Sequence, residues 1–201
     1  MKRQSEQVRS MSDREVLLHL YITQFLLLAA AGLMSWWLFD GSSFQRLFRV
    51  DVPMIVQYGG GGALVVLALD FLMMRYLPKK WYDDGGINEK IFRTRSIPHL
   101  FLLCMLIAFS EELLFRGVIQ TSFGLLMASA IFAALHVRYL SKWFLFTTVV
   151  LLSFFLGYLY DVTENLWVTI FAHFLIDFVL AVHIRLTYLQ GRRHEDWGEQ
   201  H

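Results

Sequence analysis

Long apolar runs separated by short polar connections dominate the chain. A helix needs about 17 to 25 mostly apolar residues to cross a hydrocarbon layer of roughly 30 Å. Runs of this kind predict six membrane spans, near residues 16–39, 53–77, 98–122, 124–140, 143–160 and 166–189. We therefore expect an all-α fold, a polytopic membrane helix bundle of about six transmembrane helices.

Residues 78–97 form the one long polar connection, and the pair Gly85–Gly86 breaks it. This connection divides the chain into unequal parts. We expect residues 1–97 to form a two-span N-terminal segment with a cytoplasmic linker. A four-helix core then covers 98–189, and 190–201 form a polar tail.

The composition supports lipid as the surroundings. Apolar residues make up 56% of the 201 residues, more than a single soluble core of this length needs. The first apolar run follows a mixed-charge head and has no A-x-A-like cleavage site, so we expect a span rather than a signal peptide. The glycines at 59–62 lack the Lys-Ser/Thr of a phosphate loop and indicate close helix packing or a bend. Cys104, the single cysteine, excludes a disulfide framework and a thiol metal cluster.

The basic residues are distributed unequally between the two sides of the predicted bundle. One side collects 13 of the 18 Lys and Arg: Lys2, Arg3, Arg9, Arg14, Lys79, Lys80, Lys90, Arg93, Arg95, Arg138, Lys142, Arg192 and Arg193. The other side has only Arg46 and Arg49. Cytoplasmic loops are enriched in Lys and Arg, so we expect a multi-pass protein of the cell membrane with both termini in the cytoplasm. The net charge of +1 gives no indication of nucleic acid as a partner.

Several charged or ionisable side chains interrupt the apolar spans. A charge at the centre of a membrane helix costs about 2.5–3.5 kcal/mol on insertion scales, so such residues usually face protein or water and carry function. The candidates are Glu111, Glu112 and Arg116 on the third predicted span, His136 on the fourth, and His173 and Asp177 on the sixth.

Depth along the helices brings four of these residues to one level. If the chain turns at Phe123–Gly124, Glu111 and His136 each lie about 12 residues from the turn, or roughly 18 Å deep. Counted from the polar turn at 161–165, His173 and Asp177 lie roughly 12 and 18 Å deep. We therefore expect them to converge near the middle of the membrane.

Helical spacing then assigns the faces, because residues four apart are neighbours. Glu112 and Arg116 can form an ion pair, which leaves Glu111 to face another partner. Phe132 and His136 share a face, as do His173 and Asp177. A carboxylate and two imidazoles from three helices are typical of a site that polarises water. Interhelical hydrogen bonds that only brace the bundle are the structural alternative.

Three short motifs carry a family resemblance. "EELLFR" (111–116), "FAALH" (132–136) and "HFLID" (173–177) resemble the EExxxR, FxxxH and HxxxN/D motifs of the CPBP family, which comprises CAAX prenyl proteases and bacteriocin-processing enzymes. The resemblance covers about residues 98–185. It implies an intramembrane endopeptidase that acts on a peptide or membrane-protein substrate in the lipid bilayer, with 98–189 as its catalytic core.

The resemblance also implies roles for the residues of the motifs. Glu111 with His136 would activate the attacking water. His173 with Asp177 would stabilise the oxyanion. The supporting residues would be Glu112, Arg116 and Phe132.

Residue 177 is Asp where the best-studied CAAX proteases have Asn, and an ionised Asp cannot donate a hydrogen bond to an oxyanion. It could be held protonated, orient His173 or ligate a metal. Glu111, His136 and His173 could supply a zinc shell with water as the fourth ligand, although no HExxH helix is present. We favour a glutamate–histidine site that requires no cofactor, with zinc as the alternative.

Two other function classes remain open. A non-catalytic immunity or scaffold protein could use the same helices to bind a partner. A proton or ion transporter could use Glu111, Asp177 and the histidines as a relay, but the chain lacks the inverted repeat common in transporters.

Overall fold

The computed structural model describes residues 10–40, 47–136, 139–140 and 142–198, with side chains as far as residue 192. Five of the basic residues used for the orientation lie outside the described residues: Lys2, Arg3, Arg9, Arg46 and Arg138.

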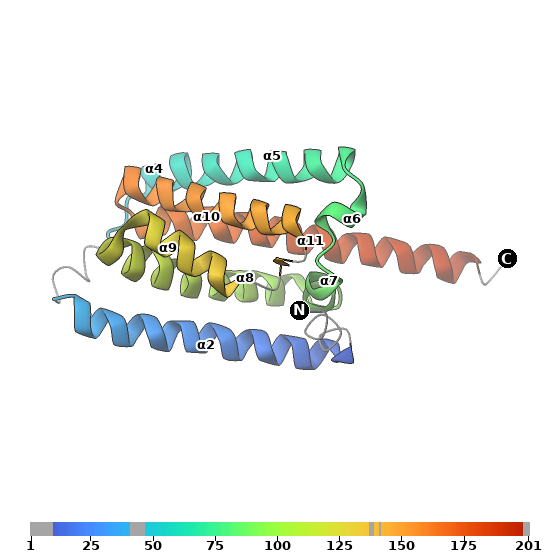
Figure 1. Cartoon of the computed structure of the whole chain (residues 1–201). Helices are drawn as coiled ribbons and strands as arrows, with labels where there is room; N and C mark the ends of the chain where they lie inside the picture. The colour runs from blue at the N-terminus through green and yellow to red at the C-terminus, as the bar shows by residue number, and fades with distance from the viewer. Residues whose placement is uncertain (1–9, 41–46, 137–138, 141, 199–201) are drawn as a thin grey trace.

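Helices account for every regular element of the described chain (Figure 1). They are α2 (Asp13–Leu38), α4 (Val52–Met54), η1 (Ile55–Gly60), α5 (Gly61–Tyr76), α6 (Lys79–Tyr82), α7 (Ile87–Phe92), α8 (Ile97–Glu112), η2 (Leu113–Gln120), α9 (Thr121–Leu135), α10 (Trp143–Thr163) and α11 (Leu166–Gly198). The elements η1 and η2 are π-helical. The expected all-α fold is confirmed, and α11 continues as a helix into the predicted polar tail.

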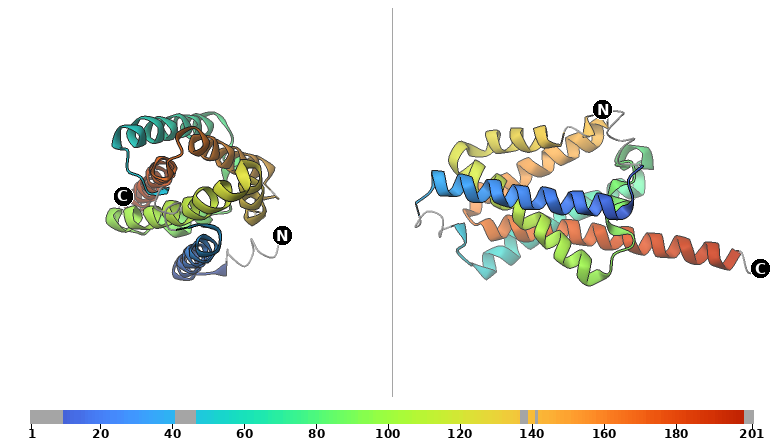
Figure 2. Two further views of the ribbon diagram at one scale, coloured as in Figure 1. Left: turned by 90° about the vertical axis from the view of Figure 1, so that its left-hand side faces the viewer. Right: turned by 90° about the horizontal axis from the view of Figure 1, so that it is seen from below.

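Five helical runs of the described chain are long and apolar enough to cross a membrane: Asp13–Leu38, Val52–Tyr76, Ile97–Leu135, Trp143–Thr163 and Leu166–Arg192. The third run contains the predicted reversal. Gly124 leaves the helical conformation at φ 82° and ψ 167°, so the chain doubles back there (Figure 2).

The return leg after Gly124 differs from the predicted span at 124–140. The helix ends at Leu135, so this leg has about 11 residues and covers roughly 16 Å at 1.5 Å per residue. That is about half of a hydrocarbon layer. The prediction was wrong in length because apolar composition places a segment in the membrane without fixing where its helix ends.

The ends of the helices follow from local sequence signals. Ser12 and Glu15 form a reciprocal capping box at the start of α2. Pro98 occupies the first turn of α8, where no backbone N–H is needed. The predicted break at Gly85 and Gly86 is confirmed by their positive φ angles of 90° and 84°. It separates the short helices α6 and α7 within the polar connection.

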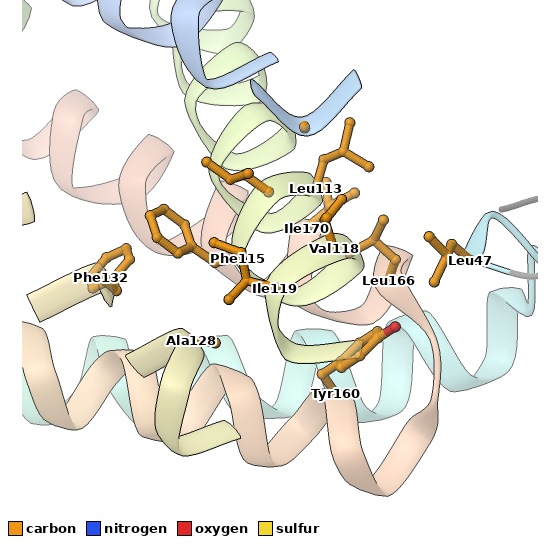
Figure 3. Close-up of a cluster of buried hydrophobic side chains, with 12 residues drawn as sticks. Leu47, Leu113, Phe115, Val118, Ile119, Ala128, Phe132, Tyr160, Leu166 and Ile170 are labelled. Atoms are coloured by element: carbon orange, nitrogen blue, oxygen red, sulfur yellow. The ribbon is translucent and has the colours of Figure 1, made fainter. Parts of the chain in front are cut away.

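Helix α11 lies at the centre of the packing, against α8, η1, α5 and α10, whereas α2 lies outside α8 and η2. Figure 3 shows the main apolar cluster, in which Phe115, Val118 and Ile119 of η2 meet Leu166 and Ile170 of α11. This cluster fixes η2 against α11 and thereby positions the polar residues just before it.

Large apolar side chains cover the outside of the bundle. Trp36 and Trp37 of α2 are 85% and 80% exposed, and Leu126 of α9 is 74% exposed. Such a surface is costly in water and favourable in hydrocarbon. Together with the five long apolar runs, it identifies a multi-pass membrane protein.

The glycines at 59–62 allow the close packing expected from the sequence. A Cβ at Gly59 would lie 2.7 Å from the carbonyl oxygen of Val168 on α11, and one at Gly62 would lie 2.8 Å from Leu159 on α10. Gly59 therefore needs a residue without a side chain, because its neighbour is backbone, whereas at Gly62 the side chain of Leu159 would have to move.

The start of α2, the helices α6 and α7, and the polar end of α11 share the right-hand end of the bundle in Figure 1. The basic residues there include Lys79, Lys80, Lys90 and Arg93. This agrees with the predicted clustering of Lys and Arg on one side.

Candidate active site

The transition from α8 to η2 places a buried ion pair in the middle of the bundle. The Nε of Arg116 lies 3.3 Å from Oε2 of Glu112, and their side chains are only 1% and 0% exposed. The predicted pairing of these two residues is confirmed. All eight residues of η2 are buried. π-Helical turns such as η2 are rare in proteins, and where they occur they are often at functional sites.

Glu112 also contacts His173 across the interface between α8 and α11. Nδ1 of His173 lies 2.9 Å from Oε1 of Glu112. Its other nitrogen, Nε2, lies 3.5 Å from Oδ2 of Asp177. The imidazole therefore lies between two carboxylates, and a continuous polar row runs from Arg116 through Glu112 and His173 to Asp177.

Arg116 has further partners on two other helices. Its guanidinium donates to the carbonyl oxygen of Ser153 on α10 at 3.1 Å, and it lies 5.6 Å from the ring centroid of Phe132 on α9. A guanidinium over an aromatic face is a favourable arrangement when water is excluded. Arg116 thus connects three helices around the polar row.

Glu111 interacts electrostatically with His173 and Asp177 of α11 and with Gln24 of α2. Its side chain is half-buried, whereas that of the adjacent Glu112 is fully buried. The two glutamates therefore differ as the helical spacing predicts: Glu112 is enclosed by partners and Glu111 is the more accessible carboxylate.

His136 is the C-cap of α9 and lies half-buried beside Phe132. The two rings stack with centroids 4.2 Å apart, and Nδ1 of His136 lies 2.9 Å from the carbonyl oxygen of Phe132. A carbonyl can only accept, so Nδ1 carries the proton of this hydrogen bond, and in a neutral ring Nε2 is then the basic nitrogen. Phe132 links His136 to Arg116 and so to the polar row.

The candidate zinc ligands do not form a metal site in the part of the chain that the structure describes. No three His, Cys, Asp or Glu side chains there are grouped so as to hold a metal ion. Both ring nitrogens of His173 face carboxylates instead. Glu111, His136 and His173 as arranged do not fit zinc.

The sequence analysis did not identify three polar residues that contact the candidate site: Gln24, Ser110 and Ser153. Ser110 donates to Gln24 Oε1 at 2.5 Å, and Ser153 accepts from Arg116. All three side chains are neutral, whereas the predicted site was built from ionisable residues in apolar runs. A buried glutamine in a lipid-spanning helix is also costly and is a similar signal of function.

This arrangement supplies the parts needed to hydrolyse an acyl compound. It offers an accessible carboxylate, a histidine with a defined basic nitrogen, and a second histidine fixed between acidic groups. Apolar walls strengthen every electrostatic interaction in such a site.

The comparisons with known proteins agree with this chemistry. Residues 93–179 match the family model described as Type II CAAX prenyl endopeptidase Rce1-like. The chain is 47% identical over 179 residues to a Bacillus subtilis (strain 168) protein named "Uncharacterized protein YpbD", covering 89% of this chain and 95% of that protein. No solved structure matches the chain. The matched segment contains all of the motif residues at the polar row, and the chain belongs to the Rce1-like family of type II CAAX prenyl endopeptidases, which are intramembrane proteases.

Proposed function

We propose that this chain is an endopeptidase of the cell membrane that hydrolyses a peptide bond near the bilayer, with Glu111 and His136 activating the water. The observation that carries the proposal is the accessible Glu111 beside the enclosed row of Glu112, His173 and Asp177. Family membership supports the reaction class.

The proposed reaction begins with attack by water on the scissile carbonyl carbon. Glu111 takes one proton from this water as the new C–O bond forms, and Nε2 of His136 accepts a hydrogen bond from the remaining O–H and orients it. Positioned acid–base groups of this kind contribute typically about 10²–10⁴-fold in rate. The C–N bond then breaks, and the proton passes to the leaving amine.

His173 and Asp177 stabilise the charge that develops on the carbonyl oxygen. Glu112 accepts the hydrogen bond from Nδ1 and so fixes the ring, which leaves Nε2 toward the more exposed Asp177. A proton on Nε2 is the donor for the oxyanion, and Asp177 orients this end of the ring. Losing one such donor costs roughly 10²–10³ in rate.

The substrate is a peptide or a membrane protein, reached from the side of the bilayer on which both termini lie. The clustered basic residues support a cytoplasmic position for that side. Arg116 and Phe132 contact no substrate in this proposal, and they hold Glu112 and His136 in place.

The experiment is cleavage of a quenched peptide library by the detergent-purified chain beside Glu111→Ala and His136→Ala, each with and without a strong zinc chelator. Loss of cleavage in both well-folded variants, with activity spared by the chelator, is the expected result. Cleavage by Glu111→Ala at the rate of the unmodified chain would overturn the proposal. Loss with chelator and rescue by zinc would overturn its metal-free form.

A further inference from the structure

The outer helix α2 touches the rest of the bundle through a narrow stripe. Its buried residues are Val16, Gln24, Ala31 and Ser35, which recur at helical spacing on one face. Most of its other large side chains are exposed to the surroundings. Gln24 is thus a polar residue at the centre of a contact face that is otherwise small or apolar.

Gln24 is only 2% exposed. A primary amide buried in a membrane span needs partners for both its oxygen and its nitrogen. Ser110 of α8 satisfies the oxygen, because its hydroxyl donates to Oε1 of Gln24 at 2.5 Å. This contact directs the other end of the amide, Nε2, away from Ser110.

The donating end of the amide has an acceptor in the next residue of α8. Glu111 follows Ser110 directly, and its carboxylate interacts electrostatically with the side chain of Gln24. One amide therefore interacts with two consecutive residues of α8: its oxygen lies at Ser110, and the carboxylate of Glu111 feels the same side chain electrostatically.

From this geometry we infer that Gln24 is a positioning residue for Glu111, which holds one carboxylate oxygen so that the other faces the attacking water. The inference rests on the proposed function of Glu111. It also extends the site beyond residues 93–179, because a helix outside the matched segment completes it.

A purely structural role for Gln24, as a clamp between α2 and α8, makes a different prediction. The same two helices share a second polar contact, between the hydroxyl of Tyr21 and Nε2 of His99 at 2.9 Å. His99 lies about 12 residues before Glu111, or roughly 18 Å along the helix. Tyr21→Phe therefore removes an α2–α8 hydrogen bond far from Glu111 and is the matched control.

The kinetic test compares Gln24→Met, which keeps the length of the side chain but cannot donate, with Ser110→Ala and Tyr21→Phe. We expect Gln24→Met to lower kcat on a cleaved quenched peptide about 10- to 100-fold, since a hydrogen bond to a charged group is lost, with KM unchanged. Ser110→Ala lowers kcat less, and adding it to Gln24→Met has little further effect because both act through one amide. Tyr21→Phe leaves kcat unchanged.

A spectroscopic test needs no substrate. The infrared carboxylate band of Glu111 is identified as the band that disappears in Glu111→Ala. We expect this band to shift in Gln24→Met and to stay in place in Tyr21→Phe, because a hydrogen bond to one oxygen alters the carboxylate stretch.

The outcomes separate this inference from the proposed function. An unshifted Glu111 band in folded Gln24→Met, or a kcat that falls equally in Tyr21→Phe, would overturn the positioning role. Cleavage that survives Glu111→Ala would overturn the proposed function, whereas inactive Glu111→Ala beside fully active Gln24→Met would refute only the role of Gln24.

Discussion

Nδ1 of His173 lies 2.9 Å from Oε1 of Glu112, and this contact joins α11 to α8 inside the bundle. The other oxygen of the same carboxylate lies 3.3 Å from Nε of Arg116. Glu112 is therefore shared between a guanidinium on its own helical segment and an imidazole that is 61 residues away. The sharing makes this glutamate the centre of the polar row and leaves Glu111 outside that pairing, as the proposed function requires.

We expect Arg116→Met to destabilise the folded state by about 3–5 kcal/mol, because it removes one partner of a buried ion pair and leaves the buried charge of Glu112 with His173 alone. The measurement is the free energy of unfolding in detergent. The double variant Arg116→Met with Glu112→Gln is the control, since it removes both charges and keeps an acceptor for His173. The double variant should be more stable than Arg116→Met alone. If its loss in free energy of unfolding equalled the sum of the losses in the two single variants, the buried ion pair would be contradicted.

We expect Asp177→Asn to retain cleavage within about tenfold, because an asparagine can still orient His173 and its amide can also donate to an oxyanion. Asp177→Ala should lose roughly 10²–10³ in kcat, the usual cost of a missing oxyanion group. Steady-state kinetics on one cleaved peptide make the comparison. Equal activity in Asp177→Ala and the unmodified chain would remove residue 177 from the proposed site.

Two neighbouring glycines should respond differently to alanine. At Gly59 the added Cβ would lie 2.7 Å from a backbone oxygen of Val168, whereas at Gly61 it would meet nothing within 4 Å. Overpacking of this kind costs typically about 1–3 kcal/mol, so Gly59→Ala lowers the free energy of unfolding by about that amount. Gly61→Ala leaves it unchanged or raises it, since Ala is the better helix former. Equal melting temperatures for the two variants would argue against close packing of η1 on α11.

The connection between α6 and α7 should loosen in acid. Partial burial raises the pKa of Asp83, but the hydrogen bond from Gly85 and the charge of Lys142 outweigh it and lower the pKa below the ordinary 3.8. A carboxyl whose folded pKa is lowered contributes stability above its unfolded pKa and loses it as the pH falls through the folded value.

Lys142 also donates to the backbone oxygen of Asp83. The ion pair of Lys142 with the Asp83 carboxylate therefore adds a second interaction between this connection and the start of α10. We expect limited proteolysis within residues 78–97 to accelerate as the pH falls below about 4. The probe is an added protease that is active in acid. We expect it to cut the Asp83→Asn variant rapidly at every pH. A rate that is independent of pH in the unmodified chain would contradict this account.

The sequence predicted much of the fold because apolar length and turn residues are local signals. It located the reversal at Phe123–Gly124, and the structure has Gly124 at a positive φ there. It could not predict that the helix after Gly124 stops at Leu135, because apolar residues still alternate with His136 and Arg138 beyond that point and no Gly or Pro marks the end.

The site was partly predictable for a similar reason. The pairing of Glu112 with Arg116 follows from spacing on one helix. The contact of Glu112 with His173 depends on how α8 and α11 rotate against each other, and no local pattern encodes that rotation. Predicting the contact of Gln24 with Ser110 needed the same kind of information, since only the packing of α2 on α8 brings the two residues together.

Cleavage of one identified peptide in water enriched in oxygen-18, by the unmodified chain beside folded Glu111→Ala, tests the central claim most directly. The account predicts that the unmodified chain produces a fragment whose new carboxyl terminus carries oxygen-18, and that Glu111→Ala produces none. A labelled fragment formed equally fast by Glu111→Ala would contradict the account, because the carboxylate assigned to water activation would then not be needed.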